Sequence, residues 1–482
     1  MKFPDSKTKI VCTLGPASHN KKIIKQLVLA GMNIARLNLA HDTIDCHHKT
    51  LKFIQEAEKE LRIDIPVMMD IPGPKIRIGE IENGPIVLKK GQTIRLTTRD
   101  ILGNTSIIPV SYKELLKSVK KNSLIYLYDG FIQLKVKDIQ EDQGEVICQV
   151  MTGGKLDSHK GLNLPHTKIF LDPIREKDLD LIAFGLEEGV TIFGISFVEK
   201  AADIIKVKEF ARKKGKEILT VAKIEREEAI NNIEEILEVT DAIMVARGDL
   251  GVQVAIEEIP VIQKSLISQA NRMNRPVITA TQMLVSMTDH IRPTRSEVTD
   301  VANAILDGTD ATMLSEETAV GKFPVETVKM MTNIAISTEL QFRNINYRSS
   351  LCNDLLQSFQ QQKPSIEDLI SIHSVESSRI IKSKYILTPT ESGNTARRIS
   401  RFKPYCWILA FTTNLEVARF LSLSYGVIPF LMPNNGIDLY KPIMDLLKTK
   451  KLVKKGDPLI LTEGMIRKKI GGTDTLRIIT VD

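Results

Sequence analysis

An alternation of short apolar runs with helical patterns, broken once by an all-β segment, is the feature that most constrains this fold. Strand-like runs occur at 8–13, 33–38 and 66–70, and helical patterns near 20–31 and 43–61 separate them. Five further strand-like runs, each followed by a helical pattern, come later, at 190–197, 218–224, 242–247, 276–281 and 311–316. Three units before the break and five after it make eight, which predicts an α/β fold built on a closed (β/α)8 barrel, the TIM barrel.

The break itself has the pattern of a small β domain. Its apolar runs are short and alternate in polarity, and the turn pairs Asn83-Gly84 and Asp129-Gly130 punctuate them. We therefore predict a small β-barrel domain at 73–168, inserted after the third strand of a TIM barrel that comprises residues 1–72 and 169–340.

Strand-like runs and helical patterns alternate again from about residue 345. The runs lie at 385–388, 407–411, 427–430, 459–461 and 476–479. This pattern is typical of an open α/β sheet, so we predict a separate C-terminal α/β domain over residues 341–482.

Composition narrows the class of protein. A chain of 482 residues with 43% apolar and 26% charged residues is too long for one core and reads as globular. It shows neither a signal-peptide pattern nor an apolar run that would span a bilayer, so we expect no membrane partner. The five cysteines form no C-x-x-C pair, which favours reduced thiols in the cytoplasm over disulfides or a zinc site.

The net charge of +7 indicates a basic surface that attracts small anions. The densest basic run, Lys448–Lys455, contains no aromatic residue. A solvated helix end explains this run better than a nucleic-acid site does, and we expect no nucleic-acid partner.

Polar side chains collect at the predicted ends of the barrel strands, where barrel enzymes place their active sites. They are Arg36, Asn38, Asp70, Lys223, Glu225, Gly248, Asp249, Thr281, Ser315 and Glu317. Lys223, Glu225 and Asp249 offer one cation and two hard oxygen ligands at the ends of two successive strands. This set suits an anionic, metal-bridged substrate, and phosphoryl transfer is the reaction that most needs it.

Each of these residues also has a plainer interpretation. Lys223 and Glu225 could form a structural ion pair, and Asp249 could cap a helix. Gly248 could serve only a tight turn, and Thr281 could belong to the core. No P-loop or protein-kinase motif occurs, so a nucleotide would have to be held by the barrel rim and the inserted domain.

Longer motifs cover nearly the whole chain. They are TKIVCTLGPAS (8–18), AGMNIARLN (30–38), GPKIR (73–77), AKIE (222–225), IMVARGDLGV (243–252), ATQML (280–284), RPTRSEVTDVANAILDGTDATMLSEETA (292–319) and TESGNTARRISRFKP (390–404). In these motifs the chain resembles the pyruvate kinase family, here without an extra C-terminal phosphohistidine-like domain. The resemblance implies the same interrupted barrel, with the β domain as a lid and the C-terminal domain as a regulatory one.

The resemblance also implies a reaction, the last step of glycolysis: transfer of the phosphoryl group from phosphoenolpyruvate to ADP, giving pyruvate and ATP, in a cytoplasmic homotetramer. Glu225 and Asp249 would hold Mg²⁺ or Mn²⁺, and Lys223 would neutralise the transferring group. By the same resemblance, Gly248, Asp249 and Thr281 would bind the substrate carboxylate, and Arg36 would bind the substrate phosphate. Asn38, His41, Arg77 and Lys160 would bind the nucleotide phosphates. Ser315 and Glu317 would form a proton relay. A non-catalytic pyruvate-kinase-like binding or regulatory protein remains the alternative.

Departures from the family pattern fall in the region that binds a monovalent cation in many members. Asn38 and Asp70 remain, but the usual serine is Ala40 and the usual threonine is Ile71. Lys75 replaces a glutamate and could supply the positive charge itself. The pattern resembles the K⁺-independent branch, so we expect that K⁺ is not required.

The loop 388–395 is a candidate effector site. Its hydroxyls and backbone N–H groups could form a phosphate nest, with Thr388, Thr390, Ser392, Gly393, Asn394 and Thr395 as its residues. Sugar phosphates bind this loop in the family. Glu391 adds a negative charge inside it, so we expect weak or absent activation by fructose 1,6-bisphosphate, with a monophosphate effector or an unliganded loop as the alternatives.

Overall fold

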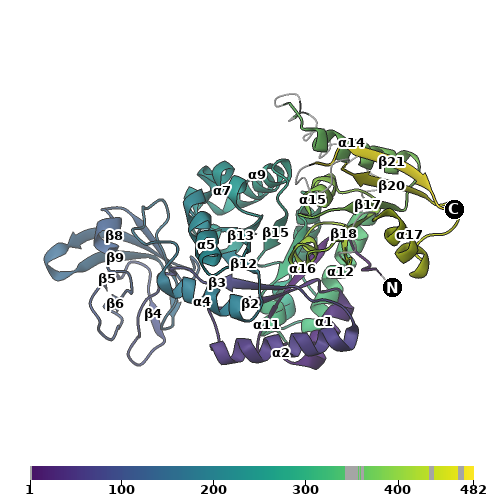
Figure 1. Ribbon diagram of the computed structural model, residues 1–482. Helices are drawn as coiled ribbons and strands as arrows, with labels where there is room; N and C mark the ends of the chain where they lie inside the picture. Colours follow the sequence, from purple (N-terminus) through teal and green to yellow (C-terminus); the bar gives the residue numbers. More distant parts are fainter. Residues whose placement is uncertain (1–2, 342–356, 358, 360–362, 434–438, 465–471) are drawn as a thin grey trace.

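Eight parallel strands close into a barrel at the centre of the molecule (Figure 1). The computed structural model describes residues 3–341, 357, 359, 363–433, 439–464 and 472–482. The barrel strands are paired in the order β1-β16-β15-β14-β13-β12-β3-β2. Their bounds are β1 Lys9–Leu14, β2 Ile34–Asn38, β3 Val67–Ile71, β12 Ile192–Ile195, β13 Leu219–Ile224, β14 Ala242–Ala246, β15 Val277–Ala280 and β16 Ala311–Leu314. The predicted barrel, interrupted after its third strand, is confirmed.

Helices cover the outside of the barrel, and their ends carry clear local signals. The α-helices are α1 Lys21–Ala30, α2 Ile44–Leu61, α4 Glu176–Glu187, α5 Ala201–Lys213, α6 Glu227–Asn231, α7 Ile233–Val239, α8 Arg247–Leu250, α9 Ile259–Arg272, α10 Arg295–Leu306, α11 Glu316–Ala319 and α12 Pro324–Gln341. The Asn20 side chain caps α1, and Gly31 ends it with a φ of 130°. A Cβ at Gly31 would lie 2.2 Å from Thr332 Oγ1, so only glycine fits there. Thr294 and Glu297 form a capping box at the start of α10.

The insertion between β3 and β12 is built from two sheets. A six-stranded sheet has the order β11-β7-β8-β9-β5-β6, and β10 pairs with β4 beside it. The elements are β4 Ile86–Leu88, β5 Thr93–Thr97, β6 Ile107–Pro109, α3 Leu115–Ser118, β7 Leu124–Leu127, β8 Ile132–Gln140, β9 Glu145–Thr152, β10 Gly154–Leu156 and β11 Leu162–Asn163. Their alternate apolar residues form a core of their own, so the insertion is a separate domain.

The C-terminal part of the chain is an open five-stranded sheet with helices, as predicted. Its strand order is β19-β18-β17-β20-β21, and only the last pair is antiparallel. The elements are α14 Ile366–Ile380, β17 Tyr385–Pro389, α15 Asn394–Ser400, β18 Trp407–Thr412, α16 Leu415–Leu421, β19 Val427–Leu431, α17 Tyr440–Thr449, β20 Pro458–Glu463 and β21 Thr475–Thr480. The basic run Lys448–Lys455 begins in the last turn of α17.

The two outer domains lie at opposite ends of the barrel (Figure 1). The insertion leaves from the carboxyl end of β3 and therefore lies on the side of the catalytic rim of such barrels. The C-terminal domain packs against the amino ends of the strands, where Phe420 and Leu423 join the apolar core inside the barrel. Lys9 Nζ, at the start of β1, donates to the carbonyl oxygen of Val427 over 2.7 Å.

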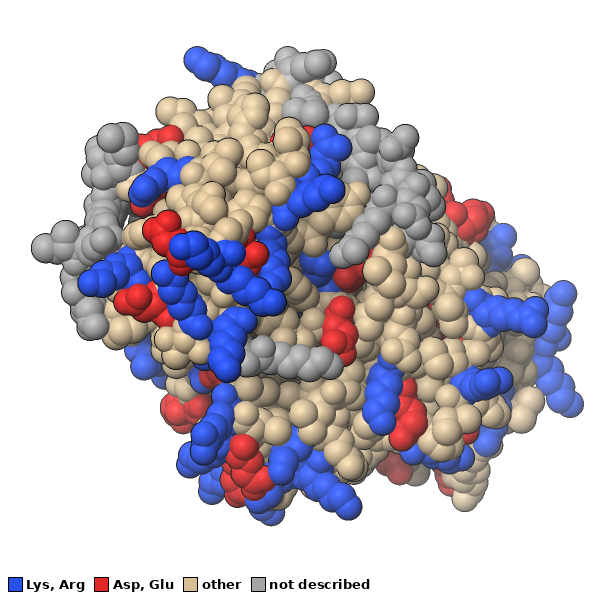
Figure 2. Space-filling model, turned by 90° about the vertical axis from the view of Figure 1, so that its right-hand side faces the viewer, with Lys and Arg blue, Asp and Glu red and all other residues tan. Residues whose placement is uncertain are grey.

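Figure 2 shows the face of the C-terminal domain, on which Lys and Arg side chains are more prominent than Asp and Glu. Within the described part of the chain, every helix is too short or too polar to cross a lipid bilayer.

Candidate active site

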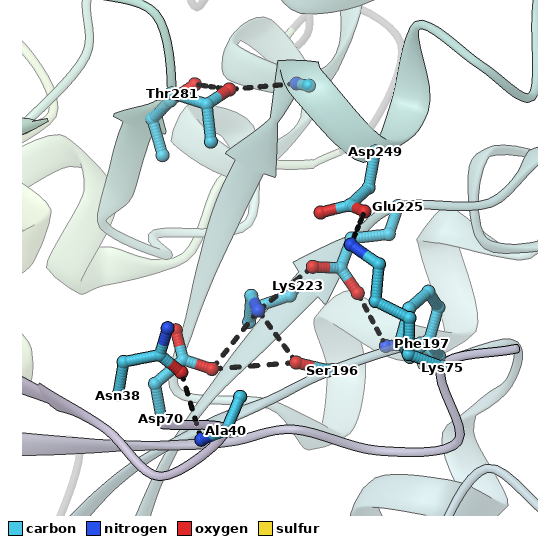
Figure 3. A network of polar contacts seen from close by, with 12 residues as sticks. Asn38, Ala40, Asp70, Lys75, Ser196, Phe197, Lys223, Glu225, Asp249 and Thr281 are labelled. Carbon is cyan, nitrogen blue, oxygen red and sulfur yellow. Dashed lines mark hydrogen bonds and ion pairs between the residues drawn. The ribbon is translucent and has the colours of Figure 1, made fainter. Parts of the chain in front are cut away.

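The Lys223 side chain lies at the centre of a polar network at the carboxyl ends of the barrel strands (Figure 3). Its Nζ is 3.0 Å from Asp70 Oδ1, 2.9 Å from Glu225 Oε1 and 2.6 Å from Ser196 Oγ. Burial alone would lower the pKa of Lys223, but the charges of Asp70 and Glu225 outweigh burial and hold that pKa above its ordinary value. The amine is therefore a fixed cation with 11% of its side chain exposed.

Arg36 approaches the same carboxylate from β2. Its Nε donates to Asp70 Oδ2 over 2.7 Å, and its Nη1 donates to Thr13 Oγ1 over 2.8 Å. Burial would raise the pKa of Asp70, but Arg36 and Lys223 together hold it below its ordinary value. Asp70 thus acts as the shared counter-ion that fixes both cations in place.

Glu225 and Asp249 follow the neighbouring strands β13 and β14, and their carboxylates lie close together (Figure 3). Glu225 Oε2 accepts the backbone N–H of Phe197 over 2.8 Å, and Lys75 Nζ reaches Asp249 Oδ1 over 3.1 Å. Burial raises the pKa of Glu225, and the nearby charge of Asp249 raises it further against the opposing effect of Lys223. The two carboxylates therefore repel each other in a site that favours additional positive charge.

That pair of carboxylates fits a divalent cation of the Mg²⁺ type. Mg²⁺ usually takes one or two protein carboxylates and completes its shell with water and substrate oxygens. Among the described residues no group of three or more His, Cys, Asp or Glu side chains could hold a metal. The rim thus suits a metal shared with an anionic substrate better than one enclosed by protein.

The ends of β14 and β15 form the opposite wall. Thr281 Oγ1 accepts the backbone N–H of Gly248 over 2.8 Å, and Thr281 has a φ of 69°, which is rare for a β-branched residue. Arg247 fixes this turn, because its Nη2 donates to Thr281 O over 2.8 Å and its Nη1 to Asp300 Oδ1 over 2.7 Å. Strain held by such contacts is typical of functional sites.

Comparisons with known proteins cover both main parts of the chain. The family model described as pyruvate kinase, barrel domain, matches residues 5–328, and the one described as pyruvate kinase, alpha/beta domain, matches residues 368–479. The chain belongs to the pyruvate kinase family.

Individual relatives agree with this assignment. The pyruvate kinase of Thermococcus litoralis is 46% identical, with 100% of both chains covered. That of Bacillus licheniformis is 41% identical, and the alignment covers 98% of this chain and 80% of the relative. The crystal structure of a pyruvate kinase from Cryptosporidium parvum has a TM-score of 0.91 at 37% identity, with 99% of this chain and 97% of that chain covered.

The residues that pyruvate kinase resemblance associates with the nucleotide lie on either side of the rim. Asn38 Oδ1 accepts the backbone N–H of Ala40 over 3.2 Å, and His41 follows on the exposed loop after β2. Partial burial lowers the pKa of His41, and the positive charge of Arg77 lowers it further. His41 and Arg77 are therefore close enough to interact electrostatically. On the insertion, Arg77 donates to His159 O over 3.0 Å, and Lys160 Nζ lies 4.4 Å from the Tyr128 ring centre.

Ser315 and Glu317 follow β16, and the structure gives them different surroundings. Glu317 is buried, and its two carboxylate oxygens accept the backbone N–H groups of Leu284 (3.1 Å) and Ser315 (2.7 Å). Glu317 therefore ties the turn after β16 to the segment after β15. Ser315 is only half-buried.

The residues expected around a monovalent cation do not all meet. Asn38 and Asp70 are neighbours in the β2–β3 register, and Ile71 is buried beside Asp70. The Lys75 amine pairs with Asp249, on the side of Glu225, and in the described contacts it bonds to neither Asn38 nor Asp70 (Figure 3).

The hydroxyls of the candidate effector loop are largely used inside the C-terminal domain. Thr390 Oγ1 accepts the Gly393 N–H over 2.9 Å, and Ser392 Oγ accepts the Asn394 N–H over 3.4 Å. Thr395 Oγ1 lies 2.5 Å from Thr473 Oγ1, and Thr388 is fully buried.

Sequence reasoning missed Thr13, Ser196, Phe197 and Arg247. Thr13 lies in β1, and Ser196 directly follows β12. The list of strand ends had omitted these two strands, so the same rule would have found both residues. The contact of the Phe197 N–H with Glu225 depends on a φ of 54°, which no local pattern predicts.

Proposed function

We propose that this chain transfers the phosphoryl group of phosphoenolpyruvate to ADP, giving pyruvate and ATP. The observation that carries the proposal is the placement of Lys223 between Asp70 and Glu225, with Asp249 at the end of the neighbouring strand and the insertion domain at the same end of the barrel. Transfer of a phosphoryl group between two anionic substrates requires a fixed cation beside carboxylates that can bind a metal ion.

Glu225 and Asp249 would hold Mg²⁺ or Mn²⁺, which would neutralise part of the negative charge of the substrates. Gly248, Asp249 and Thr281 would seat the carboxylate of phosphoenolpyruvate. Its phosphate would lie against Lys223 and the guanidinium of Arg36, both held in advance by Asp70. Because these cations are already oriented, little reorganisation is needed as negative charge shifts during transfer.

The enolate left after transfer must accept a proton at carbon. We assign Ser315 to this relay, with Glu317 holding the Ser315 backbone in position. Asn38, His41, Arg77 and Lys160 would bind the nucleotide phosphates when the insertion closes over the rim and excludes water.

Several finer properties belong to the same proposal. Lys75, paired with Asp249, would supply a fixed positive charge in place of K⁺. Asn38, Asp70 and Ile71 would then no longer need to bind that ion. We also propose a cytoplasmic homotetramer, in line with the family resemblance.

A coupled assay tests the proposal directly. Pyruvate formation, followed through lactate dehydrogenase, should require phosphoenolpyruvate, ADP and Mg²⁺ or Mn²⁺ together. A folded protein that binds phosphoenolpyruvate but forms no pyruvate would favour the alternative, a binding or regulatory protein that has kept the fold.

A further inference from the structure

A narrow cleft lined by arginines lies between the barrel and the C-terminal domain, far from the catalytic rim. It lies where the end of α9 meets α15 and the turn before β19. We call it the arginine cleft and define it by Arg275, Arg397, Arg401, Asn274, Ser424 and Asp310. It has room for about one water-sized group and opens to solvent.

Polar atoms in this cleft are shielded from solvent without a hydrogen-bond partner among the described residues. They include Nε and Nη1 of Arg397, Nε of Arg401 and Oγ of Ser424. Buried donors left unpaired cost free energy, so several of them converging on one cleft is unusual. The unpaired atoms are mainly donors, which is the complement of an oxyanion.

The charges around the cleft do not balance. Asp310 is paired with Lys403 over 2.9 Å, and Arg401 shares Asp368 with Arg398. The guanidinium groups of Arg275 and Arg397 are the remaining positive charges of the cleft.

Within the part of the chain that the structure describes, the Arg275 side chain donates to the backbone carbonyl oxygens of Leu237 (2.8 Å) and Glu238 (3.0 Å) and to no side chain. Arg397 lies against the ring of Phe420, with 5.5 Å between the guanidinium carbon and the ring centre, and within the described chain it makes no ion pair. Asp241, whose charge acts on both arginines, is engaged by Lys208 over 2.7 Å.

Burial also affects how strongly these two arginines hold their protons. It lowers the pKa of Arg397 to about 10 and also lowers the pKa of Arg275, in spite of the opposing charge of Asp241. Both groups are still cations near neutral pH, so the cleft contains two positive charges that form no ion pair with any described side chain.

We propose that the arginine cleft binds a phosphate dianion, with Arg397 as its principal donor and Arg275 as its partner from the barrel. Arginine presents parallel N–H groups that match phosphate oxygens. The enclosed part of the cleft has room for about one water-sized group, so one phosphate oxygen enters and the rest of the anion, with any organic remainder, stays at the open side. The basic face of the C-terminal domain favours the approach of such an anion (Figure 2).

This site is distinct from the loop Thr388–Thr395, in which the hydroxyls of Thr390, Ser392 and Thr395 contact other groups of the C-terminal domain. An anion in the arginine cleft would instead connect Arg397 of the C-terminal domain with Arg275, two residues before β15. The proposal does not depend on the catalytic activity of the rim.

Equilibrium dialysis with radiolabelled inorganic phosphate tests this site in the full-length protein. The wild type should bind one phosphate per chain more than Arg397→Met does. Phosphate bound at the catalytic rim is the same in both proteins and cancels in the difference. Arg419→Met is the matched control, because Arg419 also joins the C-terminal domain to the barrel but is paired with Asp64 over 2.8 Å.

A second variant and a stability measurement complete the design. Arg275→Met should lose the same phosphate from the barrel side, and it decides the question if Arg397→Met does not fold. Without phosphate, Arg397→Met should unfold at the same or a higher denaturant concentration than the wild type, because it removes a buried charge without a partner. Equal phosphate counts in the wild type and the folded variant would overturn the proposal, and so would the same loss in Arg419→Met.

Competition with a phosphomonoester in the same dialysis experiment identifies the source of the anion. If glycerol 2-phosphate competes more tightly than inorganic phosphate, the site serves a phosphorylated metabolite. If inorganic phosphate binds as tightly or more tightly, the site serves free phosphate. Both results keep the anion site, whereas binding of neither to the wild type would refute it.

Discussion

Two cations, Lys223 and Arg36, share the buried carboxylate of Asp70 at the centre of the candidate active site, and we predict that the proposed reaction depends most on Lys223. Replacing Lys223 with Met should lower kcat by roughly 10²–10³ or more, because a preorganised charge donor is lost from the transition state. It should change the half-saturating phosphoenolpyruvate concentration far less. Steady-state kinetics of both proteins measure the two effects separately.

Lys208→Met is a suitable control for Lys223→Met. Lys208 also pairs with an aspartate, Asp241, over 2.7 Å, but it lies on α5 outside the barrel. Its loss should leave kcat unchanged. Turnover of Lys223→Met close to that of the wild type would show that the lysine is only a structural ion-pair partner.

Lys75 gives a second prediction at the scale of a residue. In buffer with tetramethylammonium as the only monovalent cation, adding K⁺ should raise kcat less than about tenfold, equivalent to about 1.4 kcal/mol of barrier. Lys75→Glu should lower kcat, because it places a carboxylate beside Asp249, and Lys75→Met should lower it less. A larger response of the wild type to K⁺ would contradict the internal replacement of the ion.

At the scale of elements, the start of α10 holds the segment that follows β15. Glu297 accepts the Ser286 N–H and the Thr294 N–H, each over 2.7 Å. Glu297→Ala should therefore lower the free energy of unfolding by about 1–3 kcal/mol. Thr294→Ala removes the two bonds of the Thr294 hydroxyl, to the Glu297 N–H (3.3 Å) and to Glu297 Oε2 (2.9 Å), but leaves both 2.7 Å bonds in place, and should cost about 1 kcal/mol. Denaturant titration compares the two, and a larger loss for Thr294→Ala would reverse this ranking.

The helices and strands could largely be predicted from the sequence alone, whereas several contacts of the site could not. Periodicity predicted all eight barrel strands because each is a buried apolar run followed by a helix, and it predicted the hairpin at Asp129-Gly130 from its turn residues. The strand-end rule then brought Lys223, Glu225 and Asp249 to one rim. It could not predict that Lys75 turns toward Asp249, or that Glu317 is bound by two backbone N–H groups. Those contacts depend on loop conformations with no periodic signal.

At the scale of the whole molecule, Lys9 connects the barrel to the C-terminal domain and makes their joint stability sensitive to pH. Burial lowers the pKa of Lys9 from 10.5 to about 7, against the opposing charges of Glu339 and Asp310. Between about pH 7 and pH 10.5 the unfolded chain therefore holds a proton that the folded chain has lost. The contribution of Lys9 to the free energy of unfolding should rise with pH across this window and stay constant below it.

Denaturant midpoints measured across that pH range check this prediction. Lys9→Met should remove the rising component, so that its stability relative to the wild type falls as pH increases. Lys206→Met, at a lysine with 43% of its side chain exposed, serves as the control. Parallel pH profiles for the wild type and Lys9→Met would contradict the prediction.

The packing of Phe420 and Leu423 into the amino end of the barrel has a consequence for protein engineering. The core of this barrel is completed by side chains of another domain, so the barrel cannot be moved into another protein alone. We call Phe420 and Leu423 the plug. A chimera that joins this barrel to the C-terminal domain of a relative would have a mismatched plug, unless the residues at both of these positions matched in shape. Recombination breakpoints that keep the plug and its socket together should therefore give folded hybrids more often than breakpoints placed at the domain boundary.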